Sequence, residues 1–225
     1  MMRVRPRRPR GAAPERDQRE TAFTGILADL VRRVPGAHAA ALVDRDGETV
    51  DYAGDDAPYE TRIAAAHWRI ALESVRDQSF LADVKSLVIR AHRASFIVHA
   101  LPQGYALLVR LMRGAGFRGW QRAVPACAGR IGREAGWPEA ATVTWFDVDV
   151  SCDAEGRPCA VVCAGIAERV EVIGRHWRDP TQPEQAWRVR LASGAETTFV
   201  CESRRFWYTD EALTSLVPTN RPKNI

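Results

Sequence analysis

The sequence lacks the short patterns that mark the common catalytic sites. Its 225 residues contain no HExxH, no GxSxG and no P-loop. The histidines, which often serve as general bases or metal ligands, are scattered at positions 38, 67, 92, 99 and 176. We therefore expect a protein that is not an enzyme, with no catalytic residues, no metal site and no cofactor.

Long apolar runs and regularly spaced cysteines are also missing. No run approaches the ~20 apolar residues needed to cross a bilayer, and no apolar segment follows the basic N-terminus as a secretory signal requires. The cysteine count of five is odd and the spacing irregular, which does not suit a disulfide framework. We expect a cytoplasmic protein with reduced thiols and no membrane span.

Lysine is scarce, and arginine supplies nearly all of the positive charge. Only Lys85 and Lys223 occur, and with abundant alanine this bias indicates a GC-rich bacterial source. Residues 1–20 hold seven arginines and three acidic residues, so their net charge is 7 − 3 = +4. This equals the formal net charge of the whole chain. This Arg- and Pro-rich segment has little to bury, so we predict a disordered tail over residues 1–19. It is either a solubilising leader or a contact with nucleic acid or acidic lipid.

Apolar residues recur with helical or strand periods through the first half of the chain. The predicted elements are helices at 23–34, 58–81 and 120–135, and strands at 39–43, 49–53, 87–91, 95–101 and 105–111. Pro35-Gly36 ends the first helix, and the Asp46-Gly47 turn makes a hairpin of the first two strands. Short turns join the last three strands into an antiparallel meander. Pro125 predicts a kink or a late start in the third helix.

The helix predicted at 58–81 carries apolar residues on two nearly opposite sides. At 100° per residue, one stripe is Tyr59, Ile63, Ala66 and Ile70, and the other is Ala65, Trp68, Leu72 and Val75. One stripe can cover the chain's own sheet, whereas the second needs another partner. We favour a dimer contact, and cover by another part of the same chain is the alternative. The candidate interface residues are Ala65, Trp68, Leu72, Val75, Leu87 and Ile89.

Three arginines form a polar strip on the same helix. Arg62, Arg69 and Arg76 recur every seven residues, and such a strip suits an acidic partner surface or a nucleotide. Glu73 shares the strip, and local pairing at i,i+4 spacing explains these residues more simply. We name the three arginines as candidate partner-binding residues, with local pairing as the alternative.

The order helix, two strands, helix, three strands, helix resembles the Roadblock/dynein light-chain family over residues 20–137. The residues that carry the resemblance are VPGAHAAALVDRDGETVDYAG (34–54) and VKSLVIRAHRASFIVHALPQGYALLVRL (84–111) with the helix that follows. The resemblance implies a five-stranded sheet between helices and a homodimer built through the second helix and the third strand. It also implies Ras-like small GTPases as partners, which some family members activate and others only bind as adaptors.

Strand patterns with turn signals between them fill the second half of the chain. Strand-like runs lie at 143–152, 159–163, 168–173, 187–191 and 196–201. They predict a small antiparallel β-barrel domain over residues 138–212, followed by a tail at 213–225. The stretches AEGRPCAVVCAG, ERVEVIGRHWR and RFWYTDE resemble a small bacterial β domain that has no settled activity. The fold class is therefore α+β, a Roadblock-like α-β-β-α-β-β-β-α sandwich followed by a barrel.

Cysteines in this second half are the first candidates for a metal site. Cys152, Cys159 and Cys163 have the spacing C-x6-C-x3-C, and Cys201 is a potential fourth ligand. Structural zinc sites usually contain cysteine pairs two to four residues apart. Free cysteines that behave as small apolar residues are therefore the favoured explanation.

Two further groups suit ion binding only weakly. The acidic residues are Asp147, Asp149, Asp153 and Glu155, which do not follow the calcium-loop pattern and fit a solvated face better. The glycine-rich stretch GAGFRG at 114–119 lacks the P-loop lysine, so a flexible turn is the better interpretation.

Arginine and tryptophan also occur side by side in the second half. The pairs are Trp177-Arg178, Trp187-Arg188 and Arg205 with Trp207. Such pairs can stack on single-stranded nucleic acid, and core tryptophans with surface arginines are the simpler alternative.

These patterns favour a non-enzymatic regulatory adaptor that homodimerises and binds a Ras-like small GTPase or another signalling partner. The alternative function is a nucleic-acid-associated module that uses the Arg-rich tail and the Arg/Trp surface of the β domain.

Overall fold

The computed structural model has the element order that the sequence predicts. It describes residues 15–113, 115, 119–138, 145–163, 165–175, 184–202, 205–210 and 213. The first half contains α1 (Ala22–Arg33), β1 (Ala37–Val43), β2 (Thr49–Gly54), α2 (Pro58–Arg76), η1 (Ser79–Leu81), β3 (Ser86–Arg90), β4 (Ser95–Ala100), η2 (Pro102–Gly104) and β5 (Ala106–Leu111). The second contains α3 (Trp120–Glu134), β6 (Phe146–Cys152), β7 (Pro158–Cys163), β8 (Ile166–Arg175), β9 (Gln185–Leu191), β10 (Glu196–Cys201) and β11 (Trp207–Thr209).

The chain divides into two compact units, residues 1–117 and 118–225. The third helix falls in the second unit, whereas the sequence prediction placed the domain boundary after it, at residue 137. Among the described residues, no helix combines the length and apolar character needed to cross a bilayer.

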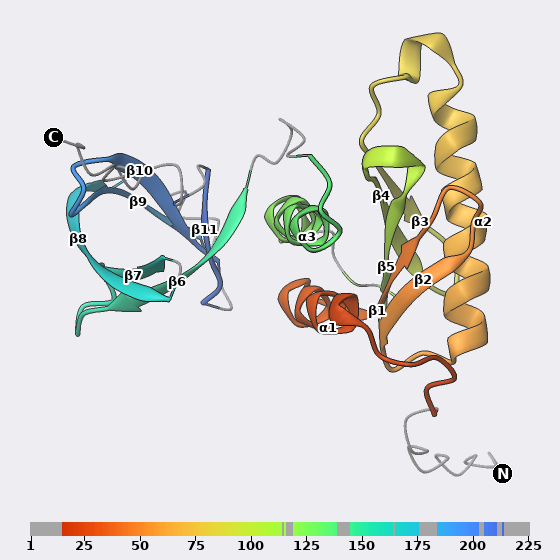
Figure 1. Ribbon diagram of the computed structural model, residues 1–225, viewed down its shortest axis with the longest axis horizontal. Helices are drawn as coiled ribbons and strands as arrows, with labels where there is room; N and C mark the ends of the chain where they lie inside the picture. Colours follow the sequence, from red (N-terminus) through yellow and green to blue (C-terminus); the bar gives the residue numbers. More distant parts are fainter. Residues whose placement is uncertain are drawn as a thin grey trace, which may run out of the picture. The chain divides into compact units, whose positions relative to one another are not determined.

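The first unit is built on a five-stranded antiparallel sheet with the order β2-β1-β5-β4-β3. Helix α1 contacts β1 and β2, while α2 contacts β1, β2, β4 and β5. The two helices lie on opposite faces of the sheet (Figure 1). The predicted α+β class and the helix-strand order of the first half are therefore confirmed.

Small residues set the distance between α2 and the sheet. Ala41 of β1 and Ala65 of α2 are buried in one core cluster with Leu72 of α2 and Phe96 of β4. A helix can approach a strand closely where both carry alanine, because no long side chain separates the two backbones. The run of alanines in β1 is thus explained by packing on both faces.

Local signals define where α1 begins and ends. Thr21 caps the helix by accepting a hydrogen bond from the Phe23 amide, and Thr24 completes the capping box. The chain then turns at Gly36, whose φ is 78°, and a Cβ at this position would lie 2.6 Å from the Ala115 Cβ. A glycine is required there for both reasons.

A buried carboxylate ties α1 to β2. The side chain of Asp51 is fully buried. It accepts hydrogen bonds from the hydroxyls of Thr21 and Thr24 and forms an ion pair with Arg16. The amide of Tyr52 is a further donor at 2.7 Å. Burial alone would raise the pKa of Asp51, but the donors from Thr21, Thr24 and Arg16 outweigh it and lower this pKa.

The segment before α1 is ordered where the sequence predicted disorder. In the N-terminal strap, which we define as residues 15–20, Arg16 donates to the Tyr52 carbonyl at 2.5 Å and Gln18 donates to the Val50 carbonyl at 2.7 Å. The predicted tail of residues 1–19 is therefore wrong for residues 15–19, because long-range bonds to β2 hold them. Residues 1–14 are not among those the structure describes.

The second unit contains a closed six-stranded barrel with the order β10-β11-β6-β7-β8-β9. Its core includes Trp187, Val189 and Leu191 of β9, which alternate with exposed arginines. Helix α3 keeps its helical form through Pro125. It is joined to the rest of this unit by Arg122, whose guanidinium pairs with Glu184 at 2.9 Å and with Glu202 at 3.2 Å. The predicted small antiparallel barrel is confirmed.

We expect Asp51→Asn to lower the free energy of unfolding by about 3 kcal/mol, because an amide cannot accept from all four donors and leaves the Arg16 charge unpaired. Urea denaturation at pH 7 measures the loss. Asp55→Asn, at an exposed position nearby, is the control and should change stability by less than about 0.5 kcal/mol. Equal losses for the two variants would contradict the anchoring role.

We also expect stability to fall between pH 6.5 and pH 4 because of His99. Burial lowers the pKa of His99 to about 4, and the charge of Lys85 adds to the effect. The unfolded chain binds this proton near pH 6.5 and the folded chain only near pH 4, so acid favours unfolding by at most about 3 kcal/mol. Denaturation at several pH values should show a shallower slope for His99→Asn, which keeps a hydrogen-bonding group beside Ser86. His92→Asn, at an exposed turn, should keep the wild-type slope.

Candidate interaction surface on helix α2

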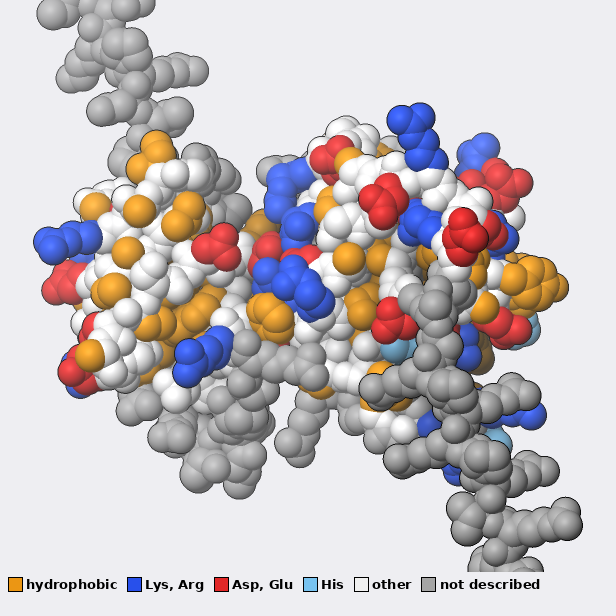
Figure 2. Space-filling view, turned by 90° about the horizontal axis from the view of Figure 1, so that it is seen from below, with side chains coloured by type: hydrophobic (Ala, Val, Ile, Leu, Met, Phe, Trp, Pro, Cys, Tyr) orange, Lys and Arg blue, Asp and Glu red, His pale blue; other side chains and the backbone are white. Residues whose placement is uncertain are grey.

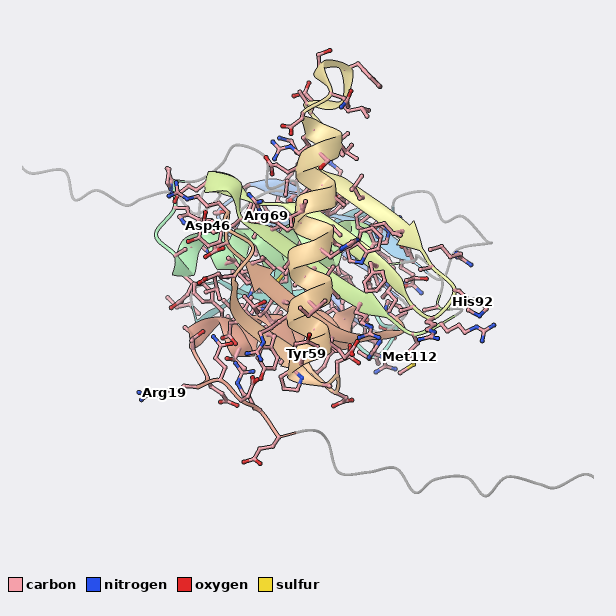
Figure 3. The ribbon with its side chains drawn as sticks, turned by 90° about the vertical axis from the view of Figure 1, so that its right-hand side faces the viewer. Arg19, Asp46, Tyr59, Arg69, His92 and Met112 are labelled. Carbon is pink, nitrogen blue, oxygen red and sulfur yellow. The ribbon has the colours of Figure 1, made fainter. Side chains whose placement is uncertain are left out.

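Helix α2 buries only one of its two apolar stripes. On the inner side, Ala65 and Leu72 are almost fully buried, and Trp68 packs on Phe96 with ring centroids 5.3 Å apart. On the outer side, Tyr59, Ile63 and Ile70 are 66%, 55% and 58% exposed. Figure 3 shows this outer face toward the viewer, with Tyr59 near the first turn of the helix. We call Tyr59, Ile63 and Ile70 the outer stripe.

The structure thus assigns the candidate dimer residues to the inner side. Ala65 and Leu72 lie in the core, and Trp68, Leu87 and Ile89 are partly buried against the same core. Val75 is also partly buried. The chain's own sheet covers Ala65 and Leu72, as the alternative interpretation stated. A role of the other four candidates in a dimer contact stays a prediction. Helical periodicity reveals two stripes but does not tell which one faces the sheet.

The two edges of the sheet differ in how their backbone groups are used. At the β2 edge, Arg16 and Gln18 of the N-terminal strap occupy the carbonyls of Tyr52 and Val50. Strand β3, at the other edge, pairs only with β4 in the part of the chain that the structure describes. An edge with free backbone groups can accept another strand, so only the β3 edge is open to extension.

The three candidate partner-binding arginines make local contacts. Arg62 pairs with Asp17 of the strap at 2.6 Å. The largely buried Arg69 has its guanidinium 3.9 Å from Glu73, and Arg76 donates to the Ala82 carbonyl at 3.5 Å. Local pairing therefore explains the strip at least in part, and a partner role for it stays a prediction.

Asp17 connects the strap to α2. The Tyr52 hydroxyl donates to Asp17 at 2.8 Å, and this bond, followed by the charge of Arg62, lowers the pKa of Asp17. Sequence reasoning missed the strap because its contacts join residues more than 30 positions apart. No local sequence pattern indicates such a contact, and the mixed charges of residues 15–20 are typical of a solvated tail.

The metal and anion candidates gain no support. Within the described ranges, no group of three or more His, Cys, Asp or Glu residues is placed to hold a metal ion. Asp147 pairs with Arg130, and Asp153 accepts from the amides of Glu155 and Arg157 within its own turn. Most of the glycine-rich stretch at 114–119 lies beyond the described residues.

The stacking surface proposed for nucleic acid is absent at the positions that can be inspected. Trp187 and Trp207 are buried in the barrel core, so neither ring is available to a base. Arg188 pairs with Glu196 at 3.0 Å on the outside. Trp177 and Arg178 belong to a stretch that the structure does not describe.

Neither family models nor curated proteins match the chain. Solved structures match about half of it. MglC from Myxococcus xanthus is 19% identical, with a TM-score of 0.42, over 51% of this chain and 99% of that one. A Roadblock/LC7 domain from Streptomyces avermitilis is 20% identical, with a TM-score of 0.41, over 50% and 95%. MglB from Myxococcus xanthus is 12% identical, with a TM-score of 0.46, over 53% and 98%.

Proposed function

We propose that the chain is a non-enzymatic regulatory adaptor that pairs with a second copy through the outer stripe of α2 and binds a signalling partner as a dimer. The exposed outer stripe carries this proposal. Its three large side chains lie on a helix whose opposite side is already buried in the core. Large apolar side chains exposed along one side of a helix usually mark an association site.

A second copy of this chain is the occupant that the geometry favours. A stripe along one helix is complementary to itself when two copies cross about a two-fold axis. The open β3 edge offers a second self-complementary element, whereas the strap blocks the β2 edge. The resemblance seen in the sequence implies a dimer through this helix and this strand, which agrees with both features.

A Ras-like small GTPase is the partner that the same resemblance implies. Arg62 has 39% of its side chain exposed, and an acidic group of the partner would replace Asp17 as its counterion. Any activating effect would come from positioning the GTPase's own groups. The barrel would supply a second docking surface, and the complex would act in the cytoplasm.

We expect the double variant Ile63→Glu, Ile70→Glu to be monomeric, because two buried carboxylates would oppose association. Light scattering at micromolar concentration should give twice the 25.0 kDa chain mass for the wild type and one chain mass for the variant. Gln78→Glu adds one such negative charge at an exposed position beyond the helix and should stay dimeric. Trp68→Glu should instead lower thermal stability, since Trp68 packs on Phe96. A monomeric wild type would contradict the dimer.

The partner class needs a separate measurement. Tagged wild-type protein retained from a lysate of its source should carry a GTP-binding protein, whose guanine nucleotide is measured in the eluate. The charged double variant should retain less, because the partner surface is built on the dimer. A dimeric wild type that retains no guanine nucleotide would refute the GTPase partner and leave the dimer standing.

A further inference from the structure

Three cysteines from separate strands gather at one end of the barrel. Cys152 is the last residue of β6, Cys159 the second residue of β7 and Cys201 the last residue of β10. Cys152 and Cys159 are exposed, while Cys201 is partly buried. Although the Cys152 residue is exposed, partial burial of its thiol raises the pKa of Cys152, and the neighbouring Cys159 raises it further. Cys152 also lies close enough to Cys201 to raise the pKa of the Cys201 thiol.

A β-bulge brings Cys159 next to Cys152. Across β6 and β7, Ser151 pairs with Ala160 and Cys152 pairs with Pro158, so the register shifts by one residue. Cys159 is the extra residue of the bulge, and it therefore faces the peptide group that joins Ser151 to Cys152. Figure 1 shows β6 and β7 side by side in the barrel.

One hydrogen bond limits the distance between the Cys159 sulfur and the Cys152 Cα. The Cys159 thiol donates to the Ser151 carbonyl at 3.3 Å. That oxygen belongs to the peptide group that ends at the Cys152 Cα, so the Cys159 Sγ lies within about 6 Å of this Cα by standard peptide dimensions. The two residues are thus neighbours across the hairpin, and an S–S bond of about 2.05 Å forms when the Cys152 side chain rotates its sulfur toward the Cys159 Sγ.

The turn between the two strands holds this arrangement. The Asp153 amide donates to the Arg157 carbonyl at 2.9 Å. The Asp153 carboxylate accepts from the Arg157 amide at 2.8 Å. Because the turn is closed by bonds at both ends, the two cysteines keep their register whether or not they are joined.

We propose that Cys152 and Cys159 form an oxidisable dithiol, a modification site on the barrel whose co-reactant is a peroxide. One thiol reacts with hydrogen peroxide to give a sulfenic acid and one water. The second thiol attacks the sulfenic sulfur, the S–O bond breaks, an S–S bond forms, and a second water leaves. The two thiols lose two electrons and two protons in total, and the peroxide is reduced to two waters.

Cys201 is a poor competitor in this reaction. Burial, followed by the nearby Cys152, raises the pKa of the Cys201 thiol to about 11, so very little thiolate exists at neutral pH. Its thiol also donates to the Glu202 carbonyl at 3.5 Å. We therefore expect Cys201 to stay reduced when Cys152 and Cys159 are oxidised.

The test is a thiol count and a peptide map after mild peroxide treatment of the full chain. Denatured wild type should fall from five free thiols to three. Cleavage after Glu155 separates Cys152 from Cys159, so a non-reducing map identifies the cross-link directly. Cys152→Ser and Cys159→Ser should each abolish it, while Cys201→Ser and Cys163→Ser should keep it.

Three results would overturn the dithiol. They are a cross-link from Cys152 to Cys201, loss of the cross-link in Cys163→Ser, and a wild type whose five thiols react without forming any intramolecular disulfide. The oxidised wild type should also keep its mass in light scattering, since the pair lies in the barrel and the outer stripe in α2.

Discussion

One constraint organises the first unit: α2 has two apolar sides and its own sheet can cover only one. Ala65 and Leu72 pack against β1, β4 and β5, and this packing fixes the rotation of the helix. Once the rotation is fixed, the exposed Tyr59, Ile63 and Ile70 must face away from the sheet; Figure 3 shows Tyr59 on this outer face. The exposed stripe is therefore a consequence of core packing, and it cannot be removed by rotating the helix without exposing the other side.

In the same unit, the strap covers the β2 edge of the sheet, while the β3 edge pairs with no further strand among the described residues. A partner strand would therefore add at the β3 edge. The strap satisfies backbone carbonyls of β2 with side chains, and its position depends on the ion pair between Arg16 and the buried Asp51. Side-chain donors cannot continue a strand ladder, so no second sheet can add there. The β3 edge carries no such device in the described region. An open edge and an exposed stripe in one unit both favour a partner that pairs with itself.

Sequence patterns predicted what depends on neighbours in the chain and missed what depends on distant residues. The helix and strand order of the first half followed from periodicity, capping and turn residues, although the end of α2 was placed late, at 81 instead of Arg76. The inner and outer stripes could not be told apart, because Trp68 and Tyr59 are equally apolar in a helical projection. The strap looked disordered because its partners, Val50, Asp51 and Tyr52, lie far along the chain.

Arginines on the described exterior of the barrel are paired with acidic side chains, and this bears on which partners those arginines can attract. On the barrel exterior, Arg188 and Arg190 share Glu196, and Arg190 also reaches Glu171. Blue and red side chains are interspersed over the visible surface (Figure 2). Paired charges of this kind create little long-range field, and a phosphate backbone needs unpaired cations to release counterions. Arg188 and Arg190 therefore contribute little to attracting a phosphate backbone.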